Sequence, residues 1–110
     1  MIGGFFLFHM CYIYILFSEK AGKYYVGQSK NPFNRLEQHN DPKNLTFTSK
    51  FADWKLKAVF SASESKRSVA SLEKYIKKQK SKLLIEKLID PEFSPDGELS
   101  GLTRIPLPDR

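Results

Sequence analysis

A chain of 110 residues has room for one domain with a single hydrophobic core. Its apolar share of 41% and aromatic share of 14% exclude an intrinsically disordered chain. Lys and Arg outnumber Asp and Glu by 18 to 12, and the net charge of +6 favours a polyanionic partner, although it would also serve solubility alone. The single cysteine, Cys11, excludes an internal disulfide, and with only His9 and His39 a zinc site of four Cys or His ligands cannot be assembled.

The run from Ile2 to Phe17 is apolar apart from His9 and the tyrosine hydroxyls. It is short for a transmembrane helix, and no Lys or Arg precedes it as in a signal peptide. Its second half, Tyr12 to Ile15, is rich in β-branched and aromatic residues, which favour a strand. We therefore expect residues 1–11 to be an N-terminal extension, arising from a start codon assigned too early, followed by a buried first strand. The alternative is a membrane anchor.

Two antiparallel strands and a helix are expected next. The strands run from Tyr12 to Phe17 and from Lys23 to Gly27, joined by a polar segment whose Gly22 suits a hairpin connection. Asn31 and Pro32 then begin a helix that ends near His39, because Asn is a good N-cap and Pro lacks an N–H that would have no partner at that position.

The second half of the chain is expected to supply a third strand and further helix. Residues 40–52 are polar and predict a loop, and apolar residues alternate from Trp54 to Phe60, as in a strand with one core-facing side. A helical pattern extends from Val69 to Leu88, with a break near Lys80. Beyond Asp90, prolines and glycines predict a flexible, loosely draped tail.

These elements predict an α+β fold, a small three-stranded antiparallel sheet flanked by helices in the order β-β-α-β-α. The domain boundaries expected are residues 1–11 for the extension, 12–90 for the folded domain and 91–110 for the tail.

Two short motifs lie on the first two strands, Tyr12-Ile13-Tyr14 and, about ten residues later, Tyr25-Val26-Gly27. Together they resemble the paired signature of the GIY-YIG nuclease superfamily. The family places an arginine on the following helix, matched here by Arg35, and a metal-binding glutamate on a later helix, matched by Glu73. Within the superfamily the chain is most similar to small single-domain bacterial proteins related to the N-terminal domain of the excision-repair nuclease. The resemblance covers Tyr12 to about Asp90.

The resemblance implies a metal-dependent phosphodiesterase that acts on DNA, with RNA not excluded. Glu73 would hold one divalent ion, Mg²⁺ or Mn²⁺, that keeps several waters, and Arg35 would clamp the scissile phosphate through its planar fork. Tyr25 or Tyr14 would accept a proton from the attacking water. His39 projects from the same helix face as Arg35 and is a candidate for proton transfer or phosphate contact. Because an unperturbed tyrosine has a pKa of about 10, we expect a rate that rises above neutral pH.

Candidate contacts to the nucleic-acid backbone are polar or basic residues near these motifs. They are Lys23, Gln28, Lys30, Lys77, Lys78, Lys80 and Lys82. Gln28 departs from the repair-nuclease branch, which carries a lysine there, and the late asparagine of several members has no counterpart after Asn44.

Plain structural roles compete with these assignments. Glu73 would pair with Lys77 one helical turn later, Arg35 with Glu37 or Asp41, and His39 would be an ordinary polar helix end. The function we expect is a cytoplasmic, structure-directed endonuclease of repair or recombination that needs no membrane and no small-molecule cofactor. The alternative is a non-catalytic nucleic-acid-binding module that kept the fold and the basic face. The sequence does not indicate an oligomeric state.

Overall fold

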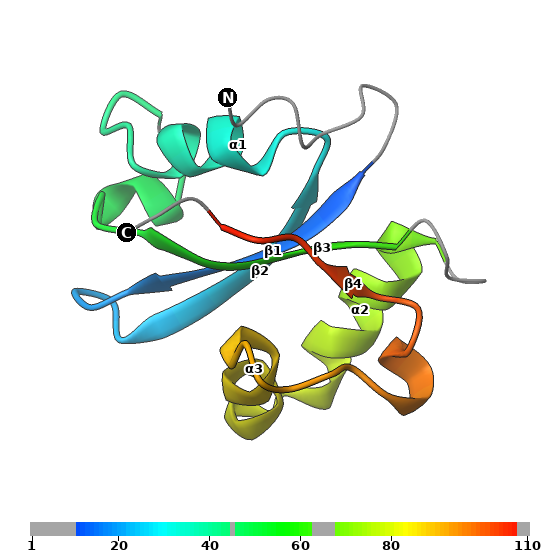
Figure 1. Ribbon diagram of the computed structural model, residues 1–110. Coiled ribbons are helices and arrows are strands. Elements are labelled where there is room, and N and C mark those ends of the chain that lie inside the picture. The colour runs from blue at the N-terminus through cyan, green and yellow to red at the C-terminus, as the bar shows by residue number, and fades with distance from the viewer. Residues whose placement is uncertain (1–10, 45, 63–67, 108–110) are drawn as a thin grey trace.

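The computed structural model describes residues 11–44, 46–62 and 68–107. It consists of one antiparallel sheet with strand order β2-β1-β3-β4, covered by α1 on one face and by α2 and α3 on the other (Figure 1). The strands are β1 (Tyr12–Ser18), β2 (Lys23–Ser29), β3 (Lys55–Ser61) and β4 (Thr103–Arg104). The helices are α1 (Pro32–His39), α2 (Val69–Gln79) and α3 (Lys82–Ile89), with the short 3₁₀ helices η2 (Thr48–Lys50) and η3 (Gly97–Leu99). The predicted α+β class with helices flanking an antiparallel sheet is confirmed, but the sheet has four strands, not three.

The strand β1 lies between β2 and β3 and is buried on both faces, which explains its nearly continuous apolar sequence. Ile13 and Ile15 pack toward α2 and α3, whereas Tyr12, Tyr14 and Leu16 belong to the core under α1. The expected N-terminal extension, residues 1–11, lies outside the described residues except for Cys11.

The strand β3 differs from the expected one-sided strand because it contributes to both cores. Its register against β1 shifts where Ile15 pairs with Ala58 and Leu16 with Leu56, so Lys57 is the extra residue of a bulge. As a result Leu56 packs with the core under α1, and Ala58 with the core under α2 and α3. A one-residue insertion reverses the facing of every later side chain, and this is why strict alternation misassigned the faces.

Side-chain caps determine where the helices begin and end. Asn31 caps α1 by accepting a hydrogen bond from the backbone N–H of Asn34, with Pro32 in the first turn, as predicted. The helix α2 ends at Lys80, which adopts the left-handed conformation with φ of 49°, and Ser81 then caps α3. The predicted break near Lys80 is therefore confirmed.

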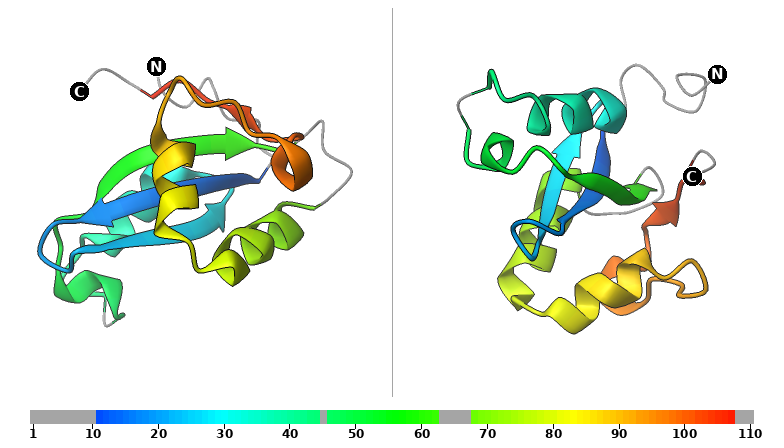
Figure 2. Two further views of the ribbon diagram at one scale, coloured as in Figure 1. Left: turned by 90° about the horizontal axis from the view of Figure 1, so that it is seen from below. Right: turned by 90° about the vertical axis from the view of Figure 1, so that its left-hand side faces the viewer.

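The segment after α3 packs against the domain and is not loosely draped. It returns to the sheet and ends as β4 beside β3 (Figure 2), and it adds Leu99 and Leu102 to the core. Arg104 holds it there: its guanidinium donates hydrogen bonds of 2.8–3.0 Å to three backbone carbonyls after and at the end of α3 and lies over the ring of Phe60. Composition pointed to a tail, but one buried cation and two leucines are enough to dock it.

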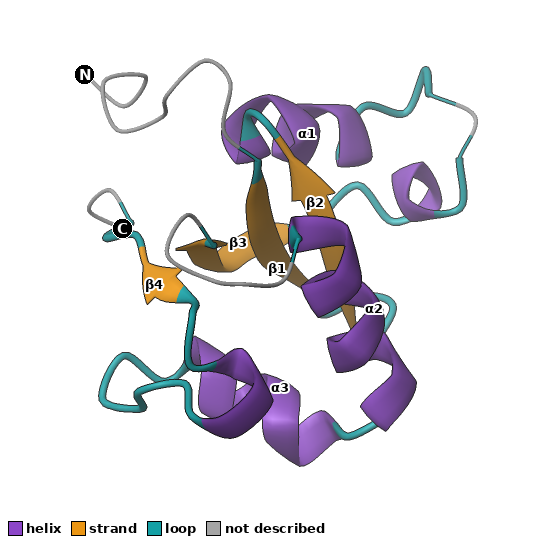
Figure 3. Ribbon diagram, turned by 90° about the vertical axis from the view of Figure 1, so that its right-hand side faces the viewer, coloured by secondary structure: helices purple, strands orange, loops and turns teal. Residues whose placement is uncertain are grey.

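The loop between α1 and β3 is tied to the fold at both ends. The side chain of Asn40 exchanges two hydrogen bonds with the backbone of Trp54, at 2.7 and 3.0 Å. The indole N–H of Trp54 donates to the carbonyl oxygen of Thr48 at 2.7 Å, which fixes η2 next to α1 (Figure 3). The residues of this loop therefore have defined places beside the two tyrosine motifs.

Candidate active site

A glycine lets the two tyrosine motifs pack together. Tyr14 of β1 pairs across the sheet with Gly27 of β2. A Cβ atom added at Gly27 would lie 2.5 Å from the Tyr14 hydroxyl oxygen and 2.9 Å from Cε1 of Tyr25, far closer than such atoms approach in proteins. The glycine of the second motif is thus required because the Tyr14 ring rests on its backbone.

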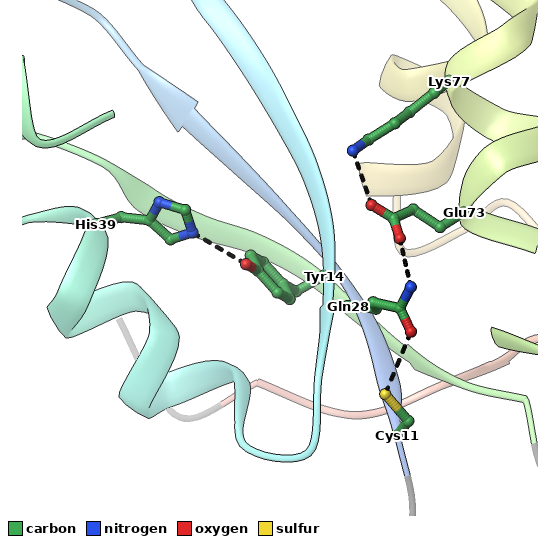
Figure 4. A network of polar contacts seen from close by, with 6 residues as sticks. All are labelled: Cys11, Tyr14, Gln28, His39, Glu73 and Lys77. Carbon is green, nitrogen blue, oxygen red and sulfur yellow. Dashed lines mark hydrogen bonds and ion pairs between the residues drawn. The ribbon is translucent and has the colours of Figure 1, made fainter. Parts of the chain in front are cut away.

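Tyr14 begins a buried chain of hydrogen bonds. Its hydroxyl lies 2.9 Å from Nε2 of His39 (Figure 4), and Nδ1 of the same imidazole lies 2.7 Å from the Thr48 hydroxyl. Both hydroxyls can donate or accept, so either neutral tautomer of the imidazole has two partners. His39 is 6% exposed and is no ordinary polar helix end.

Burial shapes the acid–base chemistry of this chain. It raises the pKa of Tyr14 to about 12, although the positive charge of Arg35 acts in the opposite direction. Burial, followed by the charge of Arg35, lowers the pKa of His39 below its usual value. His39 is therefore a neutral imidazole near pH 7, and Tyr14 keeps its proton.

Tyr25 is the tyrosine that faces the open part of the site. Its half-buried ring lies 4.7 Å from the His39 ring and 6.3 Å from the Tyr14 ring, measured between centroids. It lines a cavity of about 500 Å³ together with Arg35, His39 and residues of the loop after α1. By contrast, Tyr14 has no exposed surface.

Arg35 projects from α1 into the same cavity. Within the described part of the chain, no ion pair joins it to Glu37 or Asp41, so the competing structural role is not observed. Its buried Nε–H has no hydrogen-bond partner among the residues described. A buried, unpaired donor on a cation is costly unless a ligand satisfies it, and an anion is the complementary ligand.

Glu73 lies on the other face of β2. One carboxylate oxygen accepts a hydrogen bond of 2.8 Å from the Gln28 side chain, and the other lies 2.7 Å from Nζ of Lys77 (Figure 4). The pairing with Lys77 expected from helix spacing is therefore present. The thiol of Cys11, which is partly buried, makes a weak contact of 3.6 Å with the Gln28 oxygen. Gln28 thus orients the carboxylate, a contact that its sequence position did not reveal.

Lys77 connects the two groups around the edge of the sheet, since β2 is an edge strand. Its Nζ, paired with Glu73, also lies 5.5 Å from the centroid of the Tyr25 ring. The charge of Glu73 reaches Tyr14 as well, where it is one of the smaller effects that raise the pKa. All five candidate catalytic residues therefore lie around Tyr25.

The candidate backbone-binding lysines fall into separate places. Lys77, Lys80 and Lys82 line a second cavity of about 380 Å³ beside Tyr25, at the junction of α2 and α3. Lys23 lies instead near the aromatic ring of Phe47. Lys30 and Lys78 are exposed and line neither cavity.

A divalent metal would have few protein ligands here. No group of three or more His, Cys, Asp or Glu side chains suited to a metal exists among the described residues. The single carboxylate of Glu73, 14% exposed at the edge of a basic groove, fits a hard ion that retains most of its water. Lys77 would have to release the carboxylate, and its side chain is 51% exposed and free to turn toward solvent.

Two contributors were not foreseen from sequence. Thr48, the second partner of His39, lies in a loop without periodicity, and no local signal marks it. Phe47, at the mouth of the larger cavity, is a large apolar residue in a polar loop, and that contrast is the signal that would have found it.

Across the residues the structure describes, no helix is both long enough and apolar enough to cross a membrane. Comparison with known proteins gives one match: a sequence model described as the GIY-YIG catalytic domain covers residues 10–88. No match was found among curated proteins or among solved structures. The matched span contains both tyrosine motifs, Arg35 and Glu73, and it runs from the start of β1 to the end of α3. The chain therefore belongs to the GIY-YIG nuclease superfamily.

Proposed function

We propose that this chain is a divalent-metal-dependent endonuclease that cleaves DNA according to the structure of the substrate and not its sequence. The observation that carries the proposal is the convergence on Tyr25: Arg35 shares its cavity, and Lys77 joins it to Glu73. Phosphodiester hydrolysis needs a base, a cation for the phosphoryl oxygens and help for the leaving oxygen. These residue types supply all three.

Tyr25 is the proposed general base. A phenol with a pKa of about 12, as at Tyr14, is ionised in roughly one molecule in 10⁵ at pH 7. Tyr14 also has no exposed surface on which to meet a water molecule. Tyr25 borders the cavity, and the Lys77 ammonium beside its ring favours a phenolate. Tyr14 and His39 then act as positioning residues, because their hydrogen bond holds the imidazole against the Tyr25 ring.

Arg35 is the proposed phosphate clamp. Its unpaired Nε–H lies in the cavity wall, and a guanidinium can donate two parallel hydrogen bonds to one phosphate. Lys77, Lys80 and Lys82 would neutralise neighbouring phosphates, which adds affinity without reading bases.

Glu73 is the proposed ligand of one Mg²⁺ or Mn²⁺, and its contact with Gln28 orients it for that role. When bound, such an ion would supply charge stabilisation at the leaving oxygen. We place the activity in repair or recombination in the cytoplasm, because a domain this small has little surface for reading sequence and because its motifs resemble those of a repair nuclease.

A second candidate, a binding module without catalysis, is favoured by one observation. Both carboxylate oxygens of Glu73 are occupied, by Gln28 and by Lys77, so the resting side chain is already neutralised. This candidate predicts salt-sensitive DNA binding without cleavage.

The test is a cleavage assay on branched, single-stranded and fully paired DNA, with Mg²⁺, Mn²⁺ or EDTA. Glu73→Gln removes the charge at nearly constant shape, and Glu86→Gln, an exposed glutamate on α3, is the matched control. We expect metal-dependent cleavage that falls about 100-fold or more in Glu73→Gln and is unchanged in Glu86→Gln. Binding at low salt with no cleavage of any substrate would favour the second candidate instead.

A further inference from the structure

Phe47 is a large apolar side chain exposed beside the candidate active site. It is 56% exposed, although it lies in a loop that Asn40, Trp54 and Thr48 hold in place. One contact steadies it, an edge-on packing against the Phe51 ring at 5.6 Å between centroids. The side chain is therefore held in position while much of its surface faces solvent.

Two lysines surround this ring. Nζ of Lys23, from β2, lies 5.7 Å from the ring centroid, and Nζ of Lys50, from η2, lies 5.6 Å from it. No ion pair to either lysine occurs within the described ranges. A ring with two uncompensated ammonium groups presents an apolar surface and positive charge together. Proteins use this combination to bind single-stranded nucleic acid, where bases stack on aromatic rings and cations contact phosphates.

The ring also borders the larger cavity, across from the catalytic candidates. Phe47, Tyr25, Arg35 and His39 line the same space of about 500 Å³, a volume in the usual range for small-molecule sites. The side chains of Gln38 and Asn44 and the hydroxyl of Thr46 complete the lining. Amides and hydroxyls both donate and accept hydrogen bonds, so this wall can bond to the edge of a base.

We propose that Phe47, flanked by Lys23 and Lys50, stacks on an unpaired DNA base next to the phosphate bound by Arg35, and so selects substrates with unpaired nucleotides. The inference rests on the proposed function and names its substrate class. Only an unpaired base offers a free face for stacking, because neighbouring base pairs cover the faces within a duplex. Fully paired DNA would contact the lysines and leave the ring exposed.

The test compares DNA binding of Phe47→Ala with that of the wild type in EDTA, where no cleavage interferes. The probes are a paired duplex and the same duplex with a short single-stranded branch that carries 2-aminopurine, whose fluorescence falls on stacking. Phe47→Tyr keeps the ring. Leu83→Ala removes the other large exposed apolar side chain among the described residues, on α3, and serves as the matched control.

Stacking on one base corresponds to about 5- to 150-fold in affinity. We expect Phe47→Ala to lose affinity for the branched DNA within this range, to change less than about twofold on the duplex, and to abolish the 2-aminopurine quenching. Phe47→Tyr and Leu83→Ala should resemble the wild type. Equal losses on both DNAs, or unchanged quenching in Phe47→Ala, would overturn the proposal. Stacking without metal-dependent cleavage would refute the endonuclease and leave the stacking site standing, whereas cleavage without stacking would do the reverse.

Discussion

Replacing Gly27 by alanine is the sharpest perturbation of the site. The added Cβ would lie 2.5 Å from the Tyr14 hydroxyl oxygen, 2.6 Å from its Cζ and 2.9 Å from Cε1 of Tyr25. Non-bonded heavy atoms attract best at about 3.5–4.0 Å, so the Tyr14 ring would have to recede by about 1 Å. Tyr14 has no exposed surface and is hydrogen-bonded to His39, so the displacement would pass to His39 and Tyr25.

Two magnitudes follow from this geometry. Overpacking of this kind costs about 1–3 kcal/mol in the free energy of unfolding. A displacement of about 1 Å in catalytic groups costs roughly 100-fold in rate. Gly27→Ala should therefore lose more activity than its loss of stability explains, because the folded protein itself is impaired.

The assay measures urea unfolding and kcat/KM for branched DNA at a temperature where the variant stays folded. Gly22→Ala is the matched control: Gly22 has a φ of +62° and nothing within 4 Å of an added Cβ. It should lose about 1–2 kcal/mol through backbone strain alone and cleave normally once folded. Cleavage by Gly27→Ala within about threefold of the wild-type rate would refute the argument that this glycine sets the tyrosine geometry.

Three further predictions concern neighbouring groups. Tyr25→Phe should lower kcat by about 100-fold or more if Tyr25 is the base, while Tyr14→Phe should lower it less and leave the pH–rate profile in place; the reverse order would make Tyr14 the base. Because burial and Arg35 lower the pKa of His39, its contribution to the free energy of unfolding should be complete above about pH 6.5 and decline as the pH falls below that value. Urea unfolding at several pH values should show this slope in the wild type, and a His39→Gln variant with the same slope would contradict it. Lys80 holds a φ of 49° that glycine adopts more easily, so Lys80→Gly should unfold no more readily than the wild type yet reduce the salt dependence of DNA binding by about one phosphate contact; an unchanged slope would remove Lys80 from the interface.

How much could be predicted from sequence depends on how local the responsible interactions are. The start of α1 followed from Asn31 and Pro32, and the break between α2 and α3 near Lys80 was predicted, because capping acts over three or four residues. The first two strands followed from the composition of the two tyrosine motifs. Family membership also came from sequence, since the order and spacing of the motifs survive without any knowledge of packing.

The assignments that sequence missed depend on contacts between distant segments. The bulge at Lys57 turns the second half of β3 toward the other core, and only its pairing with β1 reveals it. The last strand exists because Arg104 reaches carbonyls near the end of α3, sixteen residues or fewer away in sequence but separated by a turn of the chain. Composition around Pro91 and Pro95 pointed instead to a tail.

The candidate site divides in the same way. Sequence alone determined which residue types were available: two tyrosines on paired strands, an arginine and a histidine one helical turn apart, and a glutamate on a later helix. Tertiary structure decided their states. Folding buried Tyr14 against Gly27 and His39, left Tyr25 open to the cavity, and joined Glu73 to Gln28 and Lys77. Burial and proton affinity depend on everything packed around a group, and that environment is assembled only when segments distant in the chain meet.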